Sequence, residues 1–388
     1  MKNKKILFLD AFSAKVSGAQ KVAFNIFNSL IALDFDVVTV HRCAPNPVAD
    51  LYDGTSCEKL CLPFEFFLKK IFGNGNFDGK TQLLKFFHII KYFFFLILIN
   101  LWVIYRTKQK KCNYIYTYDI RGLSLACLFS KLFGIKVIWH LHGEIKNSFI
   151  LNLIIKNSCY RIICPSEYIK NTIKNDTASV ILNGFYFPPY SIVEKEKNVD
   201  EINILYVGAL TPQKGIHFLI DVLSQKEFLE KKIKLKIVGD YIGHLWYSKF
   251  INELIDKSLV QVEMVGWQNN VANYYLWADV VCFTSLERGI INYDGCNHYF
   301  KSSEALPTVL IEAIAAGKPV VSTIIAGSPE IVNHGFTGFL VNEDIAQYGN
   351  AILKARNLKI NCSDIDAHRE KFSLEKMKTE IKRLFCEE

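Results

Sequence analysis

Short apolar runs alternate with apolar stripes at helical spacing in two separate parts of the chain. In the first part, the run Lys5–Asp10 is followed by a stripe that begins at Gly18 and then by the run Asp36–His41. A strand, a loop, a helix and a second strand in this order are typical of a parallel, Rossmann-like sheet. The same alternation begins again at Ile202. We therefore predict an α/β fold with two Rossmann-like domains.

The 388 residues are too many for one ordinary core and fit two domains. The segment 185–201, FYFPPYSIVEKEKNVDE, has a proline pair before a charged run, which is typical of an interdomain linker. We expect an N-terminal domain over 1–186, a linker over 187–201 and a C-terminal domain over 202–388, with the ligand in a cleft between the domains. We also expect a helix over 122–133 and an amphipathic helix over 373–385.

The net charge of +8 is unevenly distributed. Residues 1–186 hold 24 Lys and Arg against 12 Asp and Glu, whereas residues 187–388 hold 22 against 26. A basic half favours an anionic partner, such as a membrane surface or a lipid diphosphate; nucleic acid is another anionic partner, which we do not expect here. A role in solubility alone is the alternative interpretation.

The eleven cysteines show no C-x-x-C pair and no zinc spacing, so we expect reduced thiols in a cytoplasmic protein. The first residues have a basic start but a short apolar run, and we expect a strand there, not a signal peptide.

The segment 92–105, YFFFLILINLWVIY, is strongly apolar and has basic flanks, yet it is shorter than the ~20 residues that span a bilayer. It is either a buried helix or a helix in the interface of an anionic membrane.

The stretch 304–319, EALPTVLIEAIAAGKP, places Glu304 and Glu312 on either side of a helix start. Pro307 suits a first helical turn because it has no N–H to leave unpaired. The free N–H groups of the following residues then face any anion at the helix end, and Gly317 ends the helix. This pattern predicts a site for a nucleotide diphosphate, with the sugar near Glu304 and the ribose near Glu312. The structural alternative for both acids is helix capping and a surface ion pair.

The E-x7-E spacing, followed by EAIAAGKPVVST, GSPEIV and GFTGFLV, resembles the family 4 glycosyltransferases. The resemblance extends, with gaps, from SGAQKV near the N-terminus to the last helix. It implies the GT-B fold, in which two Rossmann-like domains with parallel sheets face each other across a cleft. It also implies a retaining transfer from a UDP-sugar or GDP-sugar to a saccharide acceptor. The basic, apolar N-terminal half points to a lipid-linked acceptor at the inner face of a membrane, in capsule, O-antigen or lipopolysaccharide synthesis.

Two further motifs resemble those of the family but depart from them. In VGALTPQKG, Lys214 matches the family's diphosphate-binding lysine, while Ala209 stands in the place of an arginine. Arg288, in an insert before Glu304, is a candidate replacement. The turn Ser17-Gly18-Ala19-Gln20 resembles a Gly-Gly-Ala-Glu turn that faces the donor phosphate and the acceptor. Gly18 permits close approach of a ligand.

The strand end His140-Leu141-His142 places both histidines on one face, but no third metal ligand is evident in the sequence. The resemblance places His142 beside the donor sugar and leaves His140 as packing. It implies Glu304, His142 and Lys214 as catalytic residues. Donor binding is implied for Gly18, Gly208, Lys214, Leu306, Thr308, Val309 and Glu312.

In this scheme, Glu304 holds hydroxyls of the donor sugar or stabilises an oxocarbenium-like centre, and Lys214 stabilises the departing diphosphate. No Asp-x-Asp lies where a metal would act, so we expect no metal and no cofactor. Two alternatives stay open at this point. One is a non-catalytic subunit that binds a nucleotide sugar, which the departures at Ser17 and Ala209 allow, and the other is a sugar-nucleotide epimerase of the same fold.

Overall fold

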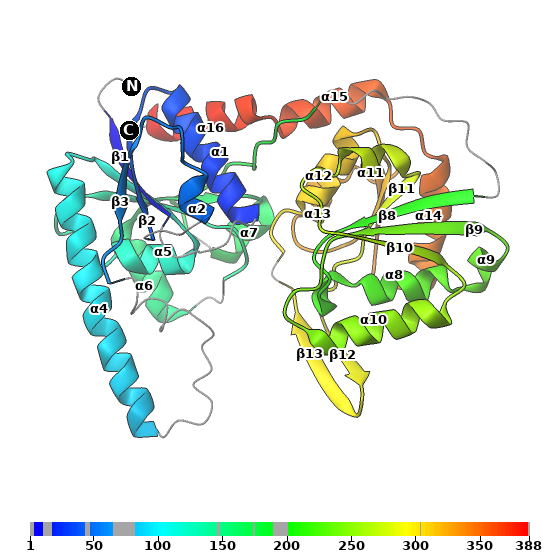
Figure 1. Cartoon of the computed structure of the whole chain (residues 1–388). Helices are drawn as coiled ribbons and strands as arrows, with labels where there is room; N and C mark the ends of the chain where they lie inside the picture. Colours follow the sequence, from blue (N-terminus) through cyan, green and yellow to red (C-terminus); the bar gives the residue numbers. More distant parts are fainter. Residues whose placement is uncertain are drawn as a thin grey trace. The chain divides into compact units, whose positions relative to one another are not determined.

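A computed structural model gives the structure of the chain, and it describes residues 4–10, 18–42, 47–64, 82–145, 148–173, 175–188, 201–302 and 304–386. The chain forms two compact units (Figure 1). Unit 1 comprises Met1–Phe185 and Leu374–Glu388, and unit 2 comprises Tyr186–Ser373. The last helix, which the sequence analysis placed in the second domain, therefore belongs to unit 1. Most of the predicted linker, 189–200, lies outside the described residues.

Unit 1 contains a seven-stranded sheet in the order β3-β2-β1-β4-β5-β6-β7, and its neighbouring strands are all parallel. The strands are β1 (Lys5–Asp10), β2 (Asp36–His41), β3 (Glu58–Cys61), β4 (Tyr114–Tyr118), β5 (Lys136–His140), β6 (Cys159–Cys164) and β7 (Ala178–Val180). The helices are α1 (Gly18–Ala32), α2 (Pro47–Asp50), α4 (Gln82–Gln109), α5 (Asp119–Ala126), α6 (Phe149–Ser158), α7 (Glu167–Ile173) and α16 (Leu374–Cys386).

Two predicted helices of unit 1 differ from the observed ones. The prediction of a helix over 122–133 is wrong, because α5 ends at Ala126 and turns follow it up to Gly134, which has a φ of +65°. The apolar segment 92–105 is the centre of the much longer α4, so its own length understated the helix. Within the described ranges, Ile90–Gln109 is long and apolar enough to cross a bilayer, judged by length and composition alone, and 33% of it is buried.

The core of unit 1 is aromatic. Phe8 of β1 stacks on Tyr116 of β4 with ring centroids 4.4 Å apart, and Phe27 and Tyr52 pack edge to face beside them. Helix α16 contributes its apolar face, including Met377, to the same core. Burial of these side chains is what attaches the C-terminal helix to the N-terminal unit.

Unit 2 contains a six-stranded sheet in the order β10-β9-β8-β11-β14-β15, again with parallel pairing throughout. The strands are β8 (Glu201–Val207), β9 (Lys232–Val238), β10 (Gln261–Gly266), β11 (Val280–Phe283), β14 (Val320–Thr323) and β15 (Gly338–Val341). The helices are η1 (Pro212–Lys214), α8 (Ile216–Leu223), α9 (Lys226–Leu229), α10 (Leu245–Lys257), α11 (Ala272–Trp277), α12 (Thr308–Ala315), α13 (Ser328–Ile331), α14 (Ile345–Asn357) and α15 (Cys362–Lys371). Two Rossmann-like α/β units confirm the predicted fold class.

The insert before Glu304 forms a β-hairpin that the sequence analysis did not predict. Strands β12 (Arg288–Tyr293) and β13 (Cys296–Lys301) pair in antiparallel register. One face of the hairpin packs on the core through Ile291 and Phe300. His298 stacks on Trp246 with ring centroids 3.7 Å apart. The other face exposes Ile290 and Tyr299, and a role of this insert in a sugar or acceptor pocket stays a prediction.

Candidate functional site

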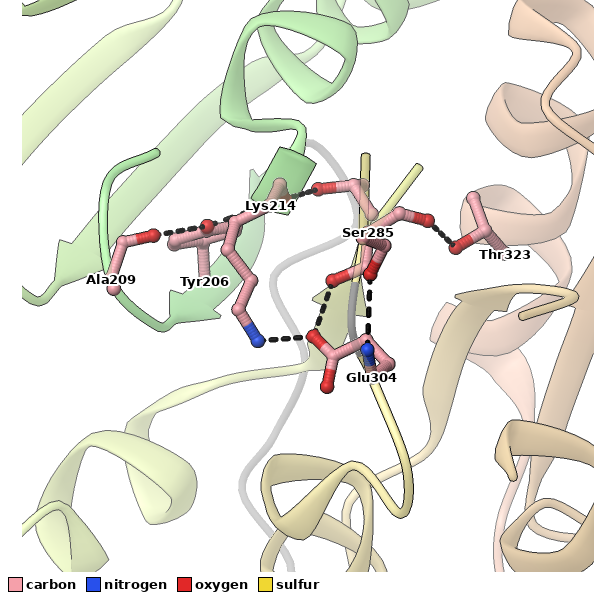
Figure 2. A network of polar contacts seen from close by, with 8 residues as sticks. Tyr206, Ala209, Lys214, Ser285, Glu304 and Thr323 are labelled. Atoms are coloured by element: carbon pink, nitrogen blue, oxygen red, sulfur yellow. Dashed lines mark hydrogen bonds and ion pairs between the residues drawn. The ribbon is translucent and has the colours of Figure 1, made fainter. Parts of the chain in front are cut away.

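An ion pair between Lys214 and Glu304 lies at the centre of the candidate site in unit 2 (Figure 2). The Lys214 ammonium donates to Glu304 Oε1, and Ser285 Oγ donates to the same oxygen at 3.0 Å. The Glu304 side chain is 12% exposed, and that of Lys214 is 31% exposed. A lysine and a carboxylate that are partly open to solvent can give up their contact with each other and bind groups of a ligand instead.

The backbone around Lys214 is fixed from several sides. Lys214 ends η1, and its carbonyl accepts hydrogen bonds from Tyr206 Oη at 3.3 Å and Thr284 Oγ1 at 3.1 Å. Gly215 follows with a φ of +68°, and a Cβ there would lie 2.0 Å from the Thr284 carbonyl oxygen. A glycine is therefore required at this position for conformation and for space.

The site lies at the carboxyl edge of the parallel sheet, where ligand sites of α/β folds form. Ser285 follows β11, and its carbonyl accepts a hydrogen bond at 2.6 Å from Thr323 Oγ1 at the end of the neighbouring β14. Gly208 follows β8, and a Cβ on Gly239 would lie 1.9 Å from its carbonyl oxygen. Gly208, Lys214 and Ser285 thus all lie at the carboxyl edge of the sheet.

The chain between Glu304 and α12 differs in one detail from the prediction. Pro307 is the N-cap of α12, not a residue of its first turn, and Thr308 is the first helical residue. Leu306 is buried, and Thr308 and Val309 are half-buried. The Ala305 carbonyl accepts a hydrogen bond from the Gly327 N–H at 3.0 Å, which holds this loop against the next one. The N–H groups of Thr308 and Val309 therefore lie in the first turn of the helix, where free backbone donors favour a bound anion.

Glu312 lies in α12 and is not bonded to the Lys214–Glu304 pair. Its Oε2 accepts a hydrogen bond at 3.0 Å from the hydroxyl of Tyr275 in α11. The structure therefore brings Lys214 and Glu304 together and places Glu312 in a separate contact of the same unit. The assignment of ribose binding to Glu312 stays a prediction.

The remaining predicted residues, Gly18 and His142, belong to unit 1. Gly18 begins α1, and no atom lies within 4 Å of a Cβ added there, so packing does not require a glycine. Residues 11–17, which include Ser17 of the predicted turn, lie outside the described residues. His142 is half-buried, with its ring 4.2 Å from that of His140 and 5.3 Å from that of Tyr118.

His140 is buried and makes a 2.7 Å hydrogen bond with the Tyr116 hydroxyl through Nδ1, as expected of a packing residue. Within the part of the chain that the structure describes, no group of three His, Cys, Asp or Glu side chains is arranged to hold a metal ion.

A buried carboxyl that the sequence analysis did not single out lies near His142. Asp10 ends β1 with no exposed surface, and it accepts hydrogen bonds from the hydroxyls of Tyr118 and Tyr52, the latter at 2.8 Å. Burial raises the pKa of Asp10 to about 6, although the two phenol hydrogen bonds act in the opposite direction. Burial also lowers the pKa of His41, at the end of the adjacent β2, to about 4. The available sequence signal was an acid at the end of a strand whose residues 6–9 are all apolar.

Comparison with known proteins agrees with this architecture. Residues 191–372 match the family model described as glycosyl transferases group 1. An uncharacterized glycosyltransferase of Methanocaldococcus jannaschii is 31% identical over 53% of this chain and 51% of its own length. The lipopolysaccharide 1,2-N-acetylglucosaminetransferase of Salmonella typhimurium is 28% identical over 54% of this chain and 55% of its own. The chain thus spans about half the length of these curated relatives.

Among solved structures, Anabaena HepE in complex with UDP and glucose has a TM-score of 0.72 at 19% identity, covering 100% of both chains. This likeness extends the GT-B fold to both units. The segment 191–372, which is similar to the group 1 glycosyl transferases, contains Lys214 and the motifs EAIAAGKPVVST, GSPEIV and GFTGFLV, so the family match agrees with the resemblance drawn from those motifs. The Lys214–Glu304 pair, Glu312 and α12 all lie within the matched segment.

Proposed function

We propose that this protein is a retaining glycosyltransferase that moves a sugar from a UDP-sugar or GDP-sugar to a saccharide acceptor without a metal ion. The observation that carries the proposal is the contact of Lys214 with Glu304 at the carboxyl edge of the unit 2 sheet, close in sequence to the start of α12. A lysine, a helix N-terminus and a carboxylate together suit a nucleotide diphosphate sugar, because the first two attract phosphate and the third accepts sugar hydroxyls.

The ion pair suggests how the donor would enter. In the protein alone, Glu304 is the partner of the Lys214 ammonium. A bound diphosphate would attract the ammonium, and Glu304 would keep the hydrogen bond from Ser285 while its carboxylate turns to the sugar. Breakage of the sugar bond adds negative charge to the leaving diphosphate, so Lys214 would stabilise the transition state more than the bound donor.

Other residues would complete the donor site. Glu312 would accept hydrogen bonds from ribose hydroxyls, and His142 would act near the sugar from unit 1. The backbone of Gly215 packs closely on Thr284, since an added Cβ would lie 2.0 Å from the Thr284 carbonyl oxygen, and this packing would hold Lys214 in place before the donor arrives.

We also propose that the acceptor is lipid-linked and that the product contributes to a cell-surface polysaccharide. The similarity to the lipopolysaccharide 1,2-N-acetylglucosaminetransferase of Salmonella typhimurium supports this choice. The bound UDP and glucose of Anabaena HepE support a UDP-sugar donor. The family match does not favour a non-catalytic subunit or an epimerase.

The test is incubation of the purified protein with a panel of UDP-sugars and GDP-sugars, with and without extracted lipid-linked saccharides. We expect one donor to raise the melting temperature, because a bound ligand stabilises the folded state, and to release nucleotide diphosphate. The product anomer, measured by NMR, should match that of the donor. Donor binding with no release under any condition would support a non-catalytic subunit, and an inverted anomer would exclude the retaining mechanism.

A further inference from the structure

Helix α4 has one face that is fixed within unit 1. Ile99, Asn100, Val103 and Thr107 of this face are buried, each with no exposed surface. The Asn100 side chain donates to the carbonyl of Ser124 in α5 at 2.9 Å and accepts from the N–H of Leu128 at 3.0 Å. These contacts set the rotation of α4 about its own axis, so the opposite face is defined as well.

The opposite face of α4 is apolar and exposed. Its members recur at spacings of three and four residues, as one side of a helix requires. They are Ile90 (50% exposed), Phe93 (54%), Phe94 (57%), Ile97 (40%), Leu101 (44%) and Tyr105 (59%). Single exposed apolar residues are ordinary, but a contiguous set of six large ones marks an interaction surface. We call this set the α4 stripe.

The part of the sequence that contains the α4 stripe is strongly basic. Between Gly79 and Gly143 the sequence holds ten Lys and Arg and one acid, Asp119. Lys108 is exposed and lies seven residues, two helical turns, after Leu101, so it continues the stripe. Near it, the Arg106 guanidinium lies over the ring of Trp102 at 5.4 Å and that of Tyr105 at 5.8 Å. Aromatic rings beside cations are typical of a membrane–water interface.

Two further exposed apolar residues of unit 1 lie outside α4. Leu132 (80% exposed) and Phe133 (43%) lie in the turns after α5, and Lys131 beside them is exposed. Figure 1 shows α4 along the outer side of unit 1, with its N-terminal end extending beyond the sheet. An extended, accessible helix of this kind can rest on a flat surface.

We propose that the α4 stripe and the basic residues that border it dock unit 1 on an anionic lipid bilayer, with α4 lying parallel to the membrane plane. The charge favours lipid over a second copy of the chain, because two copies would bring like charges together. The packed face favours a parallel helix over a spanning one, because lipid around all of α4 would require the buried Asn100 to leave its hydrogen-bond partners Ser124 and Leu128.

This inference deepens the proposed function, since a lipid-linked acceptor is embedded in such a surface, but its test needs neither donor nor acceptor. The full chain is sedimented with vesicles of phosphatidylcholine alone and with vesicles that also contain phosphatidylglycerol. We expect binding to the anionic vesicles at low salt, and partial release at high salt because salt screens the basic residues. Retained transfer to a water-soluble acceptor without vesicle binding would sink this inference and spare the proposed function.

Two variants with matched controls sharpen the test. Phe94→Gln with Leu101→Gln should lower the partition onto anionic vesicles by about tenfold or more, because burial of the apolar face provides binding. The control, Ile242→Gln with Leu259→Gln, changes two exposed apolar residues of unit 2 (60% and 84% exposed) and should bind as the wild type does. Lys108→Gln with Lys111→Gln should weaken binding at low salt only, whereas Lys249→Gln with Lys257→Gln on α10 should not.

Several results would overturn the proposal. They are absence of vesicle binding by the wild type, equal binding to neutral and anionic vesicles, and unchanged binding of the Phe94 and Leu101 variant. Retention in the vesicles after an alkaline carbonate wash would indicate a spanning helix. A dimer that this variant converts to a monomer, without vesicle binding, would indicate a second copy. Melting curves establish that each variant folds, and Ile97→Gln with Tyr105→Gln tests the same face if the first pair does not fold.

Discussion

Both units place a carboxyl group at the carboxyl edge of a parallel sheet, but the two groups differ in their exposure and in the charge of their partners. In unit 2, Glu304 is partly open and lies against the Lys214 ammonium. In unit 1, Asp10 is fully buried and accepts hydrogen bonds from the neutral phenols Tyr52 and Tyr118. One carboxylate is matched by an opposite charge, whereas the other is surrounded by groups that cannot neutralise it.

The difference separates a ligand site from a structural support. A paired, partly exposed carboxylate can change its partner at low cost in free energy, as a binding site requires. A buried carboxyl with neutral donors resists ionisation and fixes the groups that bond to it. Asp10 therefore positions Tyr118, whose ring lies against that of His142, while Glu304 is available to a sugar.

The largest expected effect comes from the cation of unit 2. We expect Lys214→Ala to lower turnover by about a hundredfold or more, about 3 kcal/mol, the scale of a single electrostatic stabiliser of a transition state. Donor affinity should fall by less, and Lys214→Arg should recover part of the rate. Steady-state kinetics with donor and acceptor give both quantities. Near-normal turnover in Lys214→Ala, together with lost turnover in Arg288→Ala, would move the role to the hairpin.

The next effect concerns the buried carboxyl of unit 1. The pKa of Asp10 is about 6 in the folded protein and near 3.8 in the unfolded chain, so the folded state holds this proton more tightly between those values. Its contribution to stability is present below about pH 4 and is lost as the pH rises to about 6. The loss amounts to about 2 to 3 kcal/mol, since one pH unit corresponds to about 1.4 kcal/mol.

The measurement is the free energy of unfolding from pH 4 to 7 for the wild type and for Asp10→Asn. His41 has a lowered pKa and contributes the opposite slope in this range. The difference in the free energy of unfolding between the two proteins therefore isolates Asp10. The stability of Asp10→Asn relative to the wild type should increase as the pH rises. A difference that is independent of pH would show that Asp10 ionises normally.

A smaller effect tests the backbone that holds Lys214. Gly215→Ala adds a methyl group 2.0 Å from the Thr284 carbonyl oxygen at a φ of +68°. Gly243 has a φ of +75° with open space around it, so Gly243→Ala brings backbone strain without a clash. We expect Gly215→Ala to cost about 2 kcal/mol more than Gly243→Ala in chemical denaturation. Equal costs would mean that the loop moves easily and that Lys214 is not rigidly held.

The smallest effect concerns the second acid of unit 2. If Glu312 binds ribose, Glu312→Ala should weaken the donor and the free nucleotide diphosphate alike, by about tenfold, the scale of one hydrogen bond to a charged group. Tyr275→Phe removes the hydroxyl that Glu312 accepts from and leaves the carboxylate, so its effect should be smaller. Unchanged affinity of Glu312→Ala for the nucleotide in calorimetry would remove Glu312 from the site.

The sequence by itself determined the elements whose pattern is local. Strands β1 and β2 have the predicted bounds because each is an apolar run between polar turns. The motifs identified Lys214, Glu304 and Glu312 through spacing along the chain. Local patterns failed where the apolar residues continue beyond the helix, as after α5, and where a hairpin alternates exposed and packed residues within an insert.

Only the tertiary structure decided which of these residues meet. Lys214 and Glu304 are 90 positions apart, and their contact depends on parallel strands that end at one edge of the sheet. The burial of Asp10 could not be read from the sequence either, and it is this burial in the folded unit that raises the pKa of the carboxyl. The exposure of the α4 stripe followed the same rule: the sequence showed an apolar helix, and packing against α5 decided which side remained uncovered. Spacing along a chain fixes local geometry, whereas charge pairing, desolvation and exposure depend on neighbours that only the fold supplies.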